Sequence, residues 1–158
     1  MTEIRQKSVR NALNKFDSKY EDINGTLCIV LEKDFILEIC RILKSDIKFD
    51  LLLDAVSIDR FKKDNRFEMV YNLYSTSNKD RMFIRIHLDS KNPEMESLSQ
   101  IWKSANWYER EAYDMMGIKF LNHPDLRRIY MPEEYEYHPL RKDFPLTGIE
   151  GSIPLPNK

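Results

Sequence analysis

Three carboxylates and two histidines in the second half of the chain could together bind a metal ion or transfer protons. The carboxylates are Glu109, Glu111 and Asp114, within one predicted helix, and the histidines are His123 and His138. Side chains two residues apart on a helix point in different directions, so Glu109 and Glu111 would not face the same ion. Each histidine precedes a proline in irregular chain, whereas a rigid site takes its ligands from regular elements. We therefore predict no catalytic residue and no metal site, and interpret this group as part of a scaffold.

The other polar residues that could do chemistry have simpler interpretations. Arg110 and Asp114 are four residues apart on the same predicted helix, so we expect them to pair with each other. His87 falls on the polar face of a predicted strand and is expected at the surface. The two cysteines, Cys28 and Cys40, lie among apolar neighbours and are too few for an iron–sulfur cluster or a four-cysteine zinc site. We predict buried, reduced thiols and no cofactor bound by this chain.

Two basic pairs, Arg127–Arg128 and Arg141–Lys142, form the second charged group. The chain has 25 basic and 26 acidic residues, so it lacks the basic excess that is usual in nucleic-acid-binding proteins. Solvated charges are one interpretation of these pairs, and would contribute little. The planar fork of arginine pairs well with carboxylates, and apolar residues frame both pairs. We therefore predict that they contact carboxylates of a partner protein, in an interface made of Arg127, Arg128, Tyr130, Leu140, Arg141, Lys142 and Phe144.

The elements that would position these groups begin with two predicted helices. Apolar spacings of four, three and four residues predict a helix over 2–20. A second apolar stripe predicts a helix over 34–44, with Asp34 as its cap. Strand-like patterns follow each helix, at 26–31, 49–59, 67–73 and 82–88.

The last three of these strands are joined by short polar connections, at 62–65 and 77–80, as hairpins require. The segment 49–59 is apolar on both faces and is predicted to be an interior strand. We expect an α+β fold, with an antiparallel sheet of about four strands and the helices packed on one face.

A third helix is predicted over 99–116, ending at Gly117, which suits the left-handed position after a helix. One apolar stripe consists of Ile101, Ala105, Tyr108, Ala112 and Met115. A second stripe, Trp102, Glu109, Tyr113 and Met116, is too aromatic for an ordinary solvated face. Two such stripes indicate a helix that packs on its own domain and also contacts something else.

The chain after Met116 cannot form a long helix or a central strand, because it contains six of the seven prolines. It is nevertheless unlike a disordered tail, which would be poor in aromatic and branched residues. Its apolar residues are Ile118, Phe120, Leu126, Ile129, Tyr130, Tyr135, Tyr137, Leu140, Phe144 and Leu146. We predict an α+β domain over 1–117 and an extended, irregular partner-docking tail over 118–158, dispensable for folding of the domain beyond about residue 122.

Three motifs in order carry a specific resemblance: WYEREAYDMMGIKF at 107–120, HPDLRRI at 123–129 and HPLRKDFP at 138–145. The sequence resembles the C subunit, or thirty-kilodalton subunit, family of respiratory NADH–quinone oxidoreductase (complex I). It departs from that family at 135–138, where members often have a Trp and a Gly, and at Met116, where an aromatic residue is common. The family motif maps onto Glu109, Arg110, Glu111, Tyr113, Asp114, Gly117, His123 and Pro124.

The resemblance implies an accessory, scaffolding subunit in the hydrophilic arm, against the larger quinone-site subunit (the forty-nine-kilodalton type), with the tail lying on that neighbour. Such a chain has no cofactor of its own, although the complex uses FMN, iron–sulfur clusters, NADH and quinone to couple electron transfer to proton translocation. No apolar run approaches the roughly 20 residues of a membrane span. The resemblance also implies a peripheral location, on the cytoplasmic side of the inner membrane.

Three alternatives remain open at this point. The first is the homologous subunit of a membrane-bound hydrogenase or of a quinone oxidoreductase with another donor. The second is a small stand-alone enzyme that uses Glu109 and His123. The third is an RNA-binding α+β domain, which would bind polyanions with strong salt dependence.

Overall fold

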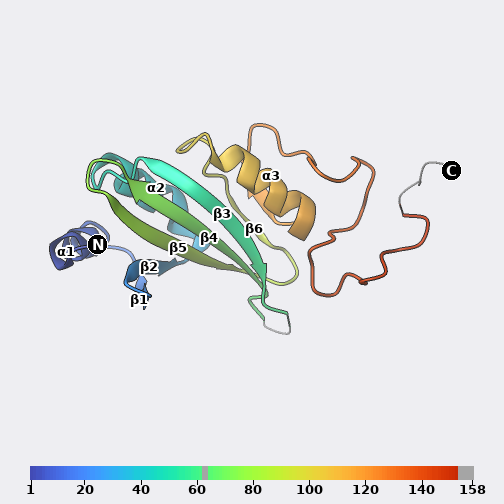
Figure 1. The fold of residues 1–158 in the computed structure, drawn as a ribbon, viewed down its shortest axis with the longest axis horizontal. Helices are drawn as coiled ribbons and strands as arrows, with labels where there is room; N and C mark the ends of the chain where they lie inside the picture. The colour runs from blue at the N-terminus through green and yellow to red at the C-terminus, as the bar shows by residue number, and fades with distance from the viewer. Residues whose placement is uncertain (62–63, 153–158) are drawn as a thin grey trace.

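The computed structural model describes residues 1–61 and 64–152. Residues 62–63, half of the predicted 62–65 connection, lie outside the described residues, as do 153–158 with Pro154 and Pro156 of the predicted tail. The described chain is an α+β domain followed by a C-terminal segment without regular structure, which runs away from one end of the domain (Figure 1). The predicted fold class is confirmed.

A five-stranded sheet with the order β1-β2-β5-β4-β3 forms the centre of the domain. Its strands are β1 (Lys19–Ile23), β2 (Thr26–Leu31), β3 (Leu51–Asp59), β4 (Phe67–Ser75) and β5 (Asp80–Leu88). The predicted antiparallel meander is present as β3-β4-β5, and β2 joins it parallel to β5. The sheet is therefore mostly antiparallel, with one strand more than predicted.

The additional strand, β1, begins at Lys19, within the last two residues of the segment predicted as the first helix. Helix α1 covers only Glu3–Ala12, and Lys19–Ile23 pairs antiparallel with β2. The turn between them is Asn24–Gly25, where both residues have positive φ, 52° and 81°. Asn-Gly with two positive φ angles is the preferred two-residue hairpin turn. The prediction of one helix over 2–20 was wrong because the apolar spacing outweighed this turn signal.

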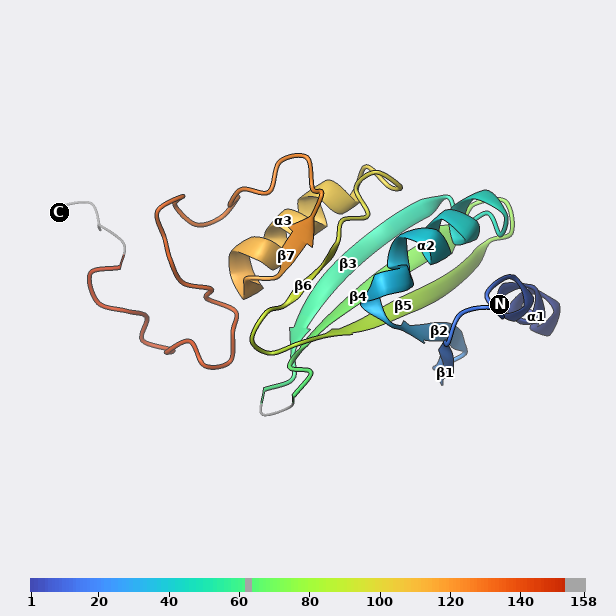
Figure 2. The same cartoon turned by 180° about the vertical axis from the view of Figure 1, so that it is seen from behind.

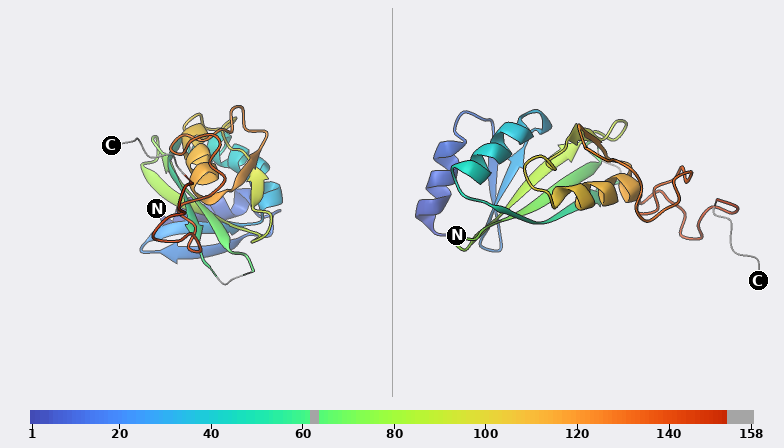
Figure 3. Two further views of the ribbon diagram at one scale, coloured as in Figure 1. Left: turned by 90° about the vertical axis from the view of Figure 1, so that its right-hand side faces the viewer. Right: turned by 90° about the horizontal axis from the view of Figure 1, so that it is seen from above.

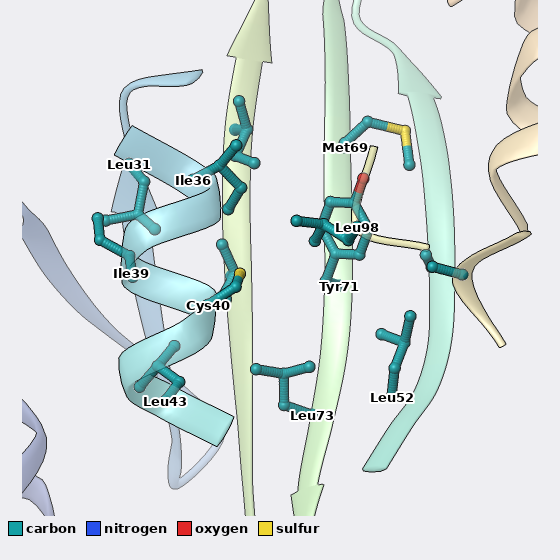
Figure 4. Close-up of a cluster of buried hydrophobic side chains, with 14 of the residues drawn as sticks. Leu31, Ile36, Ile39, Cys40, Leu43, Leu52, Met69, Tyr71, Leu73 and Leu98 are labelled. Carbon is teal, nitrogen blue, oxygen red and sulfur yellow. The ribbon is translucent and has the colours of Figure 1, made fainter. Parts of the chain in front are cut away.

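Helix α2 (Ile36–Ser45) lies across one face of the sheet (Figure 2). Its buried residues Ile36, Ile39, Cys40 and Leu43 point toward the strands and form the core shown in Figure 4. A short 3-10 turn, η1 (Lys33–Phe35), precedes the helix, and neither N-terminus has a side-chain cap, so the predicted capping by Asp34 is wrong. Both cysteines are free and buried, as predicted.

Helix α3 (Ala105–Met116) lies beside β3, which is an edge strand. The prediction of an interior position for β3 was wrong, because its apolar residues Leu51, Leu53 and Val56 are exposed on the outer side. Residues of the α3 region cover part of the strand edge: Ser104 Oγ donates to Leu52 O at 3.0 Å, and Tyr108 Oη donates to Leu53 O at 2.7 Å. This contact aligns α3 with the sheet and directs its C-terminal end toward the tail.

Strand β7 (Lys119–Leu121) pairs in parallel with β6 (Glu94–Glu96) and extends the domain past the predicted end at residue 117. Ile118 and Phe120 are buried in the core, so this first part of the predicted tail is domain structure. The views in Figure 3 show α1 at one end of the molecule and the C-terminal segment at the other. Among the described residues, no helix is long and apolar enough to cross a membrane.

Candidate partner-binding site

Asp114, near the end of α3, is the centre of the contacts that hold the C-terminal segment. Its carboxylate is fully buried and accepts hydrogen bonds from Arg128 Nη1 at 2.6 Å and from the backbone N–H groups of Ile129, Tyr130 and Met131 at 2.7–3.1 Å. Burial alone would raise the pKa of Asp114, but these four donors hold it below its ordinary value. The carboxylate therefore stays charged and fixes residues 128–131 against the helix.

The predicted pair of Arg110 with Asp114 is wrong. Arg110 instead donates to the carbonyl oxygens of Arg127 and Arg128, at 3.1 and 3.3 Å, and its guanidinium lies 5.0 Å from the Trp107 ring centroid. Arg110 and Asp114, about one helical turn apart, thus hold the same stretch of the tail.

The last carbonyl oxygens of α3 form the second attachment point. The end of a helix leaves these acceptors unpaired and carries a partial negative charge. His138 Nδ1 lies 2.9 Å from Asp114 O, Leu140 N donates to Met115 O at 3.1 Å, and Arg141 Nε donates to Met116 O at 2.7 Å. Burial lowers the pKa of His138 against the opposing effect of the hydrogen bond to Asp114 O, and the charges of Arg141 and Arg128 lower it further.

Gly117 ends α3 with a φ of 73°, as predicted. A Cβ at this position would collide with the side chains of both His138 and Arg141. The residue must therefore be glycine for two reasons: the left-handed backbone and the close approach of the tail.

Asp59, at the end of β3, is the third attachment point. Its carboxylate pairs with Arg66 at 2.6 Å and accepts from the backbone N–H of Lys142 at 2.8 Å. The same Arg66 also binds Asp143 at 2.8 Å. The Arg66 guanidinium holds the pKa of Asp59 below its ordinary value. Asp59 and Arg66 were not predicted from the sequence, because nothing in the spacing of either residue indicates a contact with residues 142–143.

These contacts give the predicted interface residues different roles. Arg128 and Arg141 hold the tail on its own domain, with the side chain of Arg128 only 9% exposed. Arg127 is exposed and pairs with Asp125 at 3.0 Å. Tyr130 and Leu140 are 64% and 56% exposed. Participation of these residues in a partner interface stays a prediction. The exposed side chains of Tyr130 and Leu140 support it better than Arg128 and Arg141, which already bind groups of their own domain.

Lys142 and Phe144, the last two predicted interface residues, lie at the third attachment point. The Lys142 side chain is exposed, while its backbone N–H is bound by Asp59. Phe144 is half-buried and its ring lies 6.5 Å from that of Tyr137.

Glu109 and His123 lie close together, 3.9 Å apart, and both side chains are fully buried. Glu109 accepts from Ser97 Oγ at 2.6 Å and from Leu98 N at 2.7 Å, which ties the segment before α3 to the helix. His123 Nδ1 accepts from Asp125 N, and Nε2 lies 3.3 Å from Asn106 O. Because no substrate could reach either side chain from solvent, this geometry favours a structural role.

The remaining candidates are separated from this pair. Glu111 is exposed and points away from Glu109, as predicted, with Tyr130 Oη at 3.4 Å. Tyr113 is half-buried, Pro124 is exposed, and His87 is exposed as predicted. Within residues 1–61 and 64–152, no three His, Cys, Asp or Glu residues are grouped so that they could hold a metal ion.

Glu109 gives the domain a predicted pH dependence. Burial raises the pKa of Glu109 to about 7, above the ordinary value of 4.5. Between these two pH values the folded state therefore keeps a proton on Glu109 that the unfolded state has released. The contribution of Glu109 to the unfolding free energy is fully present below pH 4.5 and is lost as the pH rises through about 7. For Glu109→Gln we expect a flatter pH profile of the unfolding free energy between pH 5 and 7, and a gain of up to roughly 3 kcal/mol at pH 8. Urea unfolding across this range measures it; an unchanged profile would show that Glu109 is charged in the folded protein throughout.

Comparison with known proteins agrees with the sequence motifs. The family model for the respiratory-chain NADH dehydrogenase 30 Kd subunit matches residues 29–150. The C subunit of the NADH-quinone oxidoreductase of Geotalea uraniireducens is 44% identical over 128 residues, covering 81% of this chain and 78% of the relative. The corresponding C subunit of Geobacter sulfurreducens is 40% identical over 146 residues, covering 90% of both chains.

Two solved structures share the fold. A trypsin-resistant fragment (1-134) of Nqo5 aligns with a TM-score of 0.69 and 31% identity, covering 77% of this chain and 98% of the fragment. A chain of the membrane-bound sulfane sulfur reductase, an archaeal respiratory membrane complex, aligns with a TM-score of 0.78 at 23% identity, covering 91% of this chain and 87% of that one. The motif residues around Asp114, the family model and relatives that match nearly the whole chain lead to one conclusion: this protein belongs to the family of the respiratory-chain NADH dehydrogenase 30 Kd subunit, which is the C subunit of NADH-quinone oxidoreductase.

Proposed function

We propose that this chain is an accessory subunit that holds the quinone-reducing module of the complex together and binds no cofactor itself. The observation that carries the proposal is the C-terminal segment. It is held on its own domain by Asp114, by the end of α3 and by Asp59, yet it leaves apolar side chains exposed, among them Tyr130, Leu140 and Leu146. Exposed apolar residues on an otherwise ordered segment are typical of a protein interface.

The proposed partner is the larger quinone-site subunit, of the forty-nine-kilodalton type, with the complex arranged so that this chain is peripheral, on the cytoplasmic side of the inner membrane. The redox chemistry and proton translocation then belong to the neighbouring subunits. Holding residues 128–144 in place before assembly lowers the entropy cost of binding, because fewer side chains and backbone angles have to be ordered in the interface.

The nearest alternative is the equivalent subunit of a complex with another electron donor. The likeness to a chain of the sulfane sulfur reductase supports only a shared fold, whereas the relatives that match most of the chain are named as subunits of NADH-quinone oxidoreductases. Affinity purification of the chain from detergent-solubilised membranes separates the two possibilities. Flavin-containing NADH-oxidising subunits in the purified complex support the NADH donor, and their absence would support the alternative.

Removal of the residues after Phe144 tests the docking role of the tail. A chain ending at Phe144 keeps all three attachment points, so we expect unchanged thermal unfolding of the isolated domain but a several-fold loss of intact complex on native gels. Within 145–152 the backbone makes only local turn hydrogen bonds, and Leu146 is fully exposed. In the free chain this segment should be cut rapidly by subtilisin, and more slowly within the complex.

A shorter chain ending at Asn122 serves as the comparison. It would leave Asp114 buried without Arg128 and the three backbone donors, so we now expect it to destabilise the domain, contrary to the prediction that residues beyond 122 are dispensable. Normal assembly of the chain ending at Phe144 would show that the last residues do not dock on the partner.

A further inference from the structure

An apolar hollow is formed within the C-terminal segment itself. Its volume is about 740 Å³, and its lining includes Met131, Tyr135, Pro139, Phe144 and Ile149. A smaller hollow of about 220 Å³ adjoins it and shares Phe144 and Ile149. Because Phe144 and Ile149 belong to both, we take the two hollows together as one candidate site.

The aromatic wall of this hollow is held in place from behind. Tyr135 is only 5% exposed, with the Arg128 guanidinium 5.8 Å from its ring centroid. Tyr137 packs against Tyr135 at 5.5 Å and against Phe144 at 6.5 Å, between ring centroids. The contacts of Arg128 and Asp143 with the domain thus hold this aromatic wall in place before any partner binds.

The charges around the hollow are predominantly negative. Three acidic residues, Glu136, Asp143 and Glu150, contribute to its lining, against one arginine, Arg141, which keeps its positive charge while it donates to Met116 O. Asp143 pairs with Arg66, which also pairs with Asp59. Glu136 and Glu150 are exposed and make no ion pair with any of the described residues, and the turn beside Tyr135 exposes two more glutamates, Glu133 and Glu134.

We propose that this hollow binds a segment of a neighbouring subunit that presents an apolar side chain flanked by lysine or arginine. The apolar lining selects the side chain, and the unpaired glutamates select the basic flanks. This reverses the expectation from the sequence, in which the tail would supply arginines to carboxylates of the partner. Negative charge around the hollow also disfavours anionic lipid and nucleic acid as occupants. The inference rests on the proposed function, because it identifies the chemistry of the docking partner.

Charge reversal in the assembled complex tests the proposal. We expect the double variant Glu136→Lys and Glu150→Lys to lower the yield of intact complex by roughly tenfold, because like charges would then face each other. The matched control is Glu3→Lys, an exposed glutamate on α1 at the opposite end of the molecule, which should leave the yield unchanged (Figure 3). Thermal unfolding of each isolated variant verifies that the domain is folded.

Cross-linking identifies the occupant independently of assembly yield. With the photoreactive residue p-benzoylphenylalanine in place of Tyr137, we expect cross-links within the complex to a segment of another subunit that carries an apolar residue beside at least one lysine or arginine. Cross-links to an acidic or uncharged segment, or none to another subunit, would overturn the proposal, as would a normal yield of the double variant. If one of these contradicting results is obtained but the unmodified chain co-purifies with the complex, the scaffold function stands and only the proposed docking chemistry fails. If the unmodified chain does not co-purify, the scaffold function itself fails.

Discussion

Replacement of Asp114 by asparagine is expected to destabilise the isolated chain by about 3–5 kcal/mol, because it leaves the Arg128 guanidinium buried without its counter-charge. The carboxylate accepts four hydrogen bonds, three of them from consecutive backbone N–H groups, and an amide cannot accept all four without turning its own N–H toward a donor. Thermal or urea unfolding measures the loss. The same variant should lower the amount of intact complex several-fold.

The matched control is Glu111→Gln, a carboxylate on the same helix that is exposed and, among residues 1–61 and 64–152, has only Tyr130 Oη as a hydrogen-bond partner, at 3.4 Å. Its expected cost is below about 1 kcal/mol. Arg128→Ala should resemble Asp114→Asn, and Arg128→Lys should recover only part of the loss, since lysine lacks the planar group that lies over Tyr135. Complexes that do assemble should turn over NADH and quinone near the normal rate. Equal stability of the Asp114 and Glu111 variants, or normal complex levels with collapsed turnover, would contradict the structural role of this carboxylate.

Replacement of Gly117 by alanine is expected to release residues 138–141 from the end of α3. The left-handed backbone alone costs roughly 1–2 kcal/mol for a residue with a Cβ. The collision with His138 and Arg141 adds to this, because His138 is held at Asp114 O and Arg141 at Met116 O, and moving either side chain would weaken that contact. Hydrogen exchange should show faster exchange of the Leu140 amide, whose acceptor is Met115 O.

Gly25, in the turn between β1 and β2, provides the control for this substitution. Its φ is 81°, but a Cβ there would meet nothing within 4 Å. Gly25→Ala therefore carries the backbone strain without the collision, and the difference in unfolding free energy between the two variants isolates the packing contribution. A loss of the same size in both variants, with unchanged exchange at Leu140, would show that the tail does not press on Gly117.

Local patterns were sufficient for the parts of this protein that depend on neighbours in the chain. Alternating apolar residues correctly predicted β4 and β5, and Gly117 correctly predicted the end of α3, because side-chain period and left-handed backbone are properties of short segments. The Asn24–Gly25 turn was equally local and would have revealed β1, had it been weighed against the helical spacing before it. The family motifs are local as well, and they predicted the correct family.

The partners of the charged residues were beyond such patterns. Asp114 has an arginine four residues before it, and the spacing favoured that pair, yet the carboxylate binds Arg128, fourteen residues away. Asp59 binds the backbone of Lys142, 83 residues away, and β3 lies at the sheet edge although its sequence is apolar on both sides. Chain spacing describes only which groups can meet within one element. Which buried carboxylate faces which donor depends on how helix, sheet and tail pack together, since a buried charge requires whatever donors the packing brings within about 3 Å.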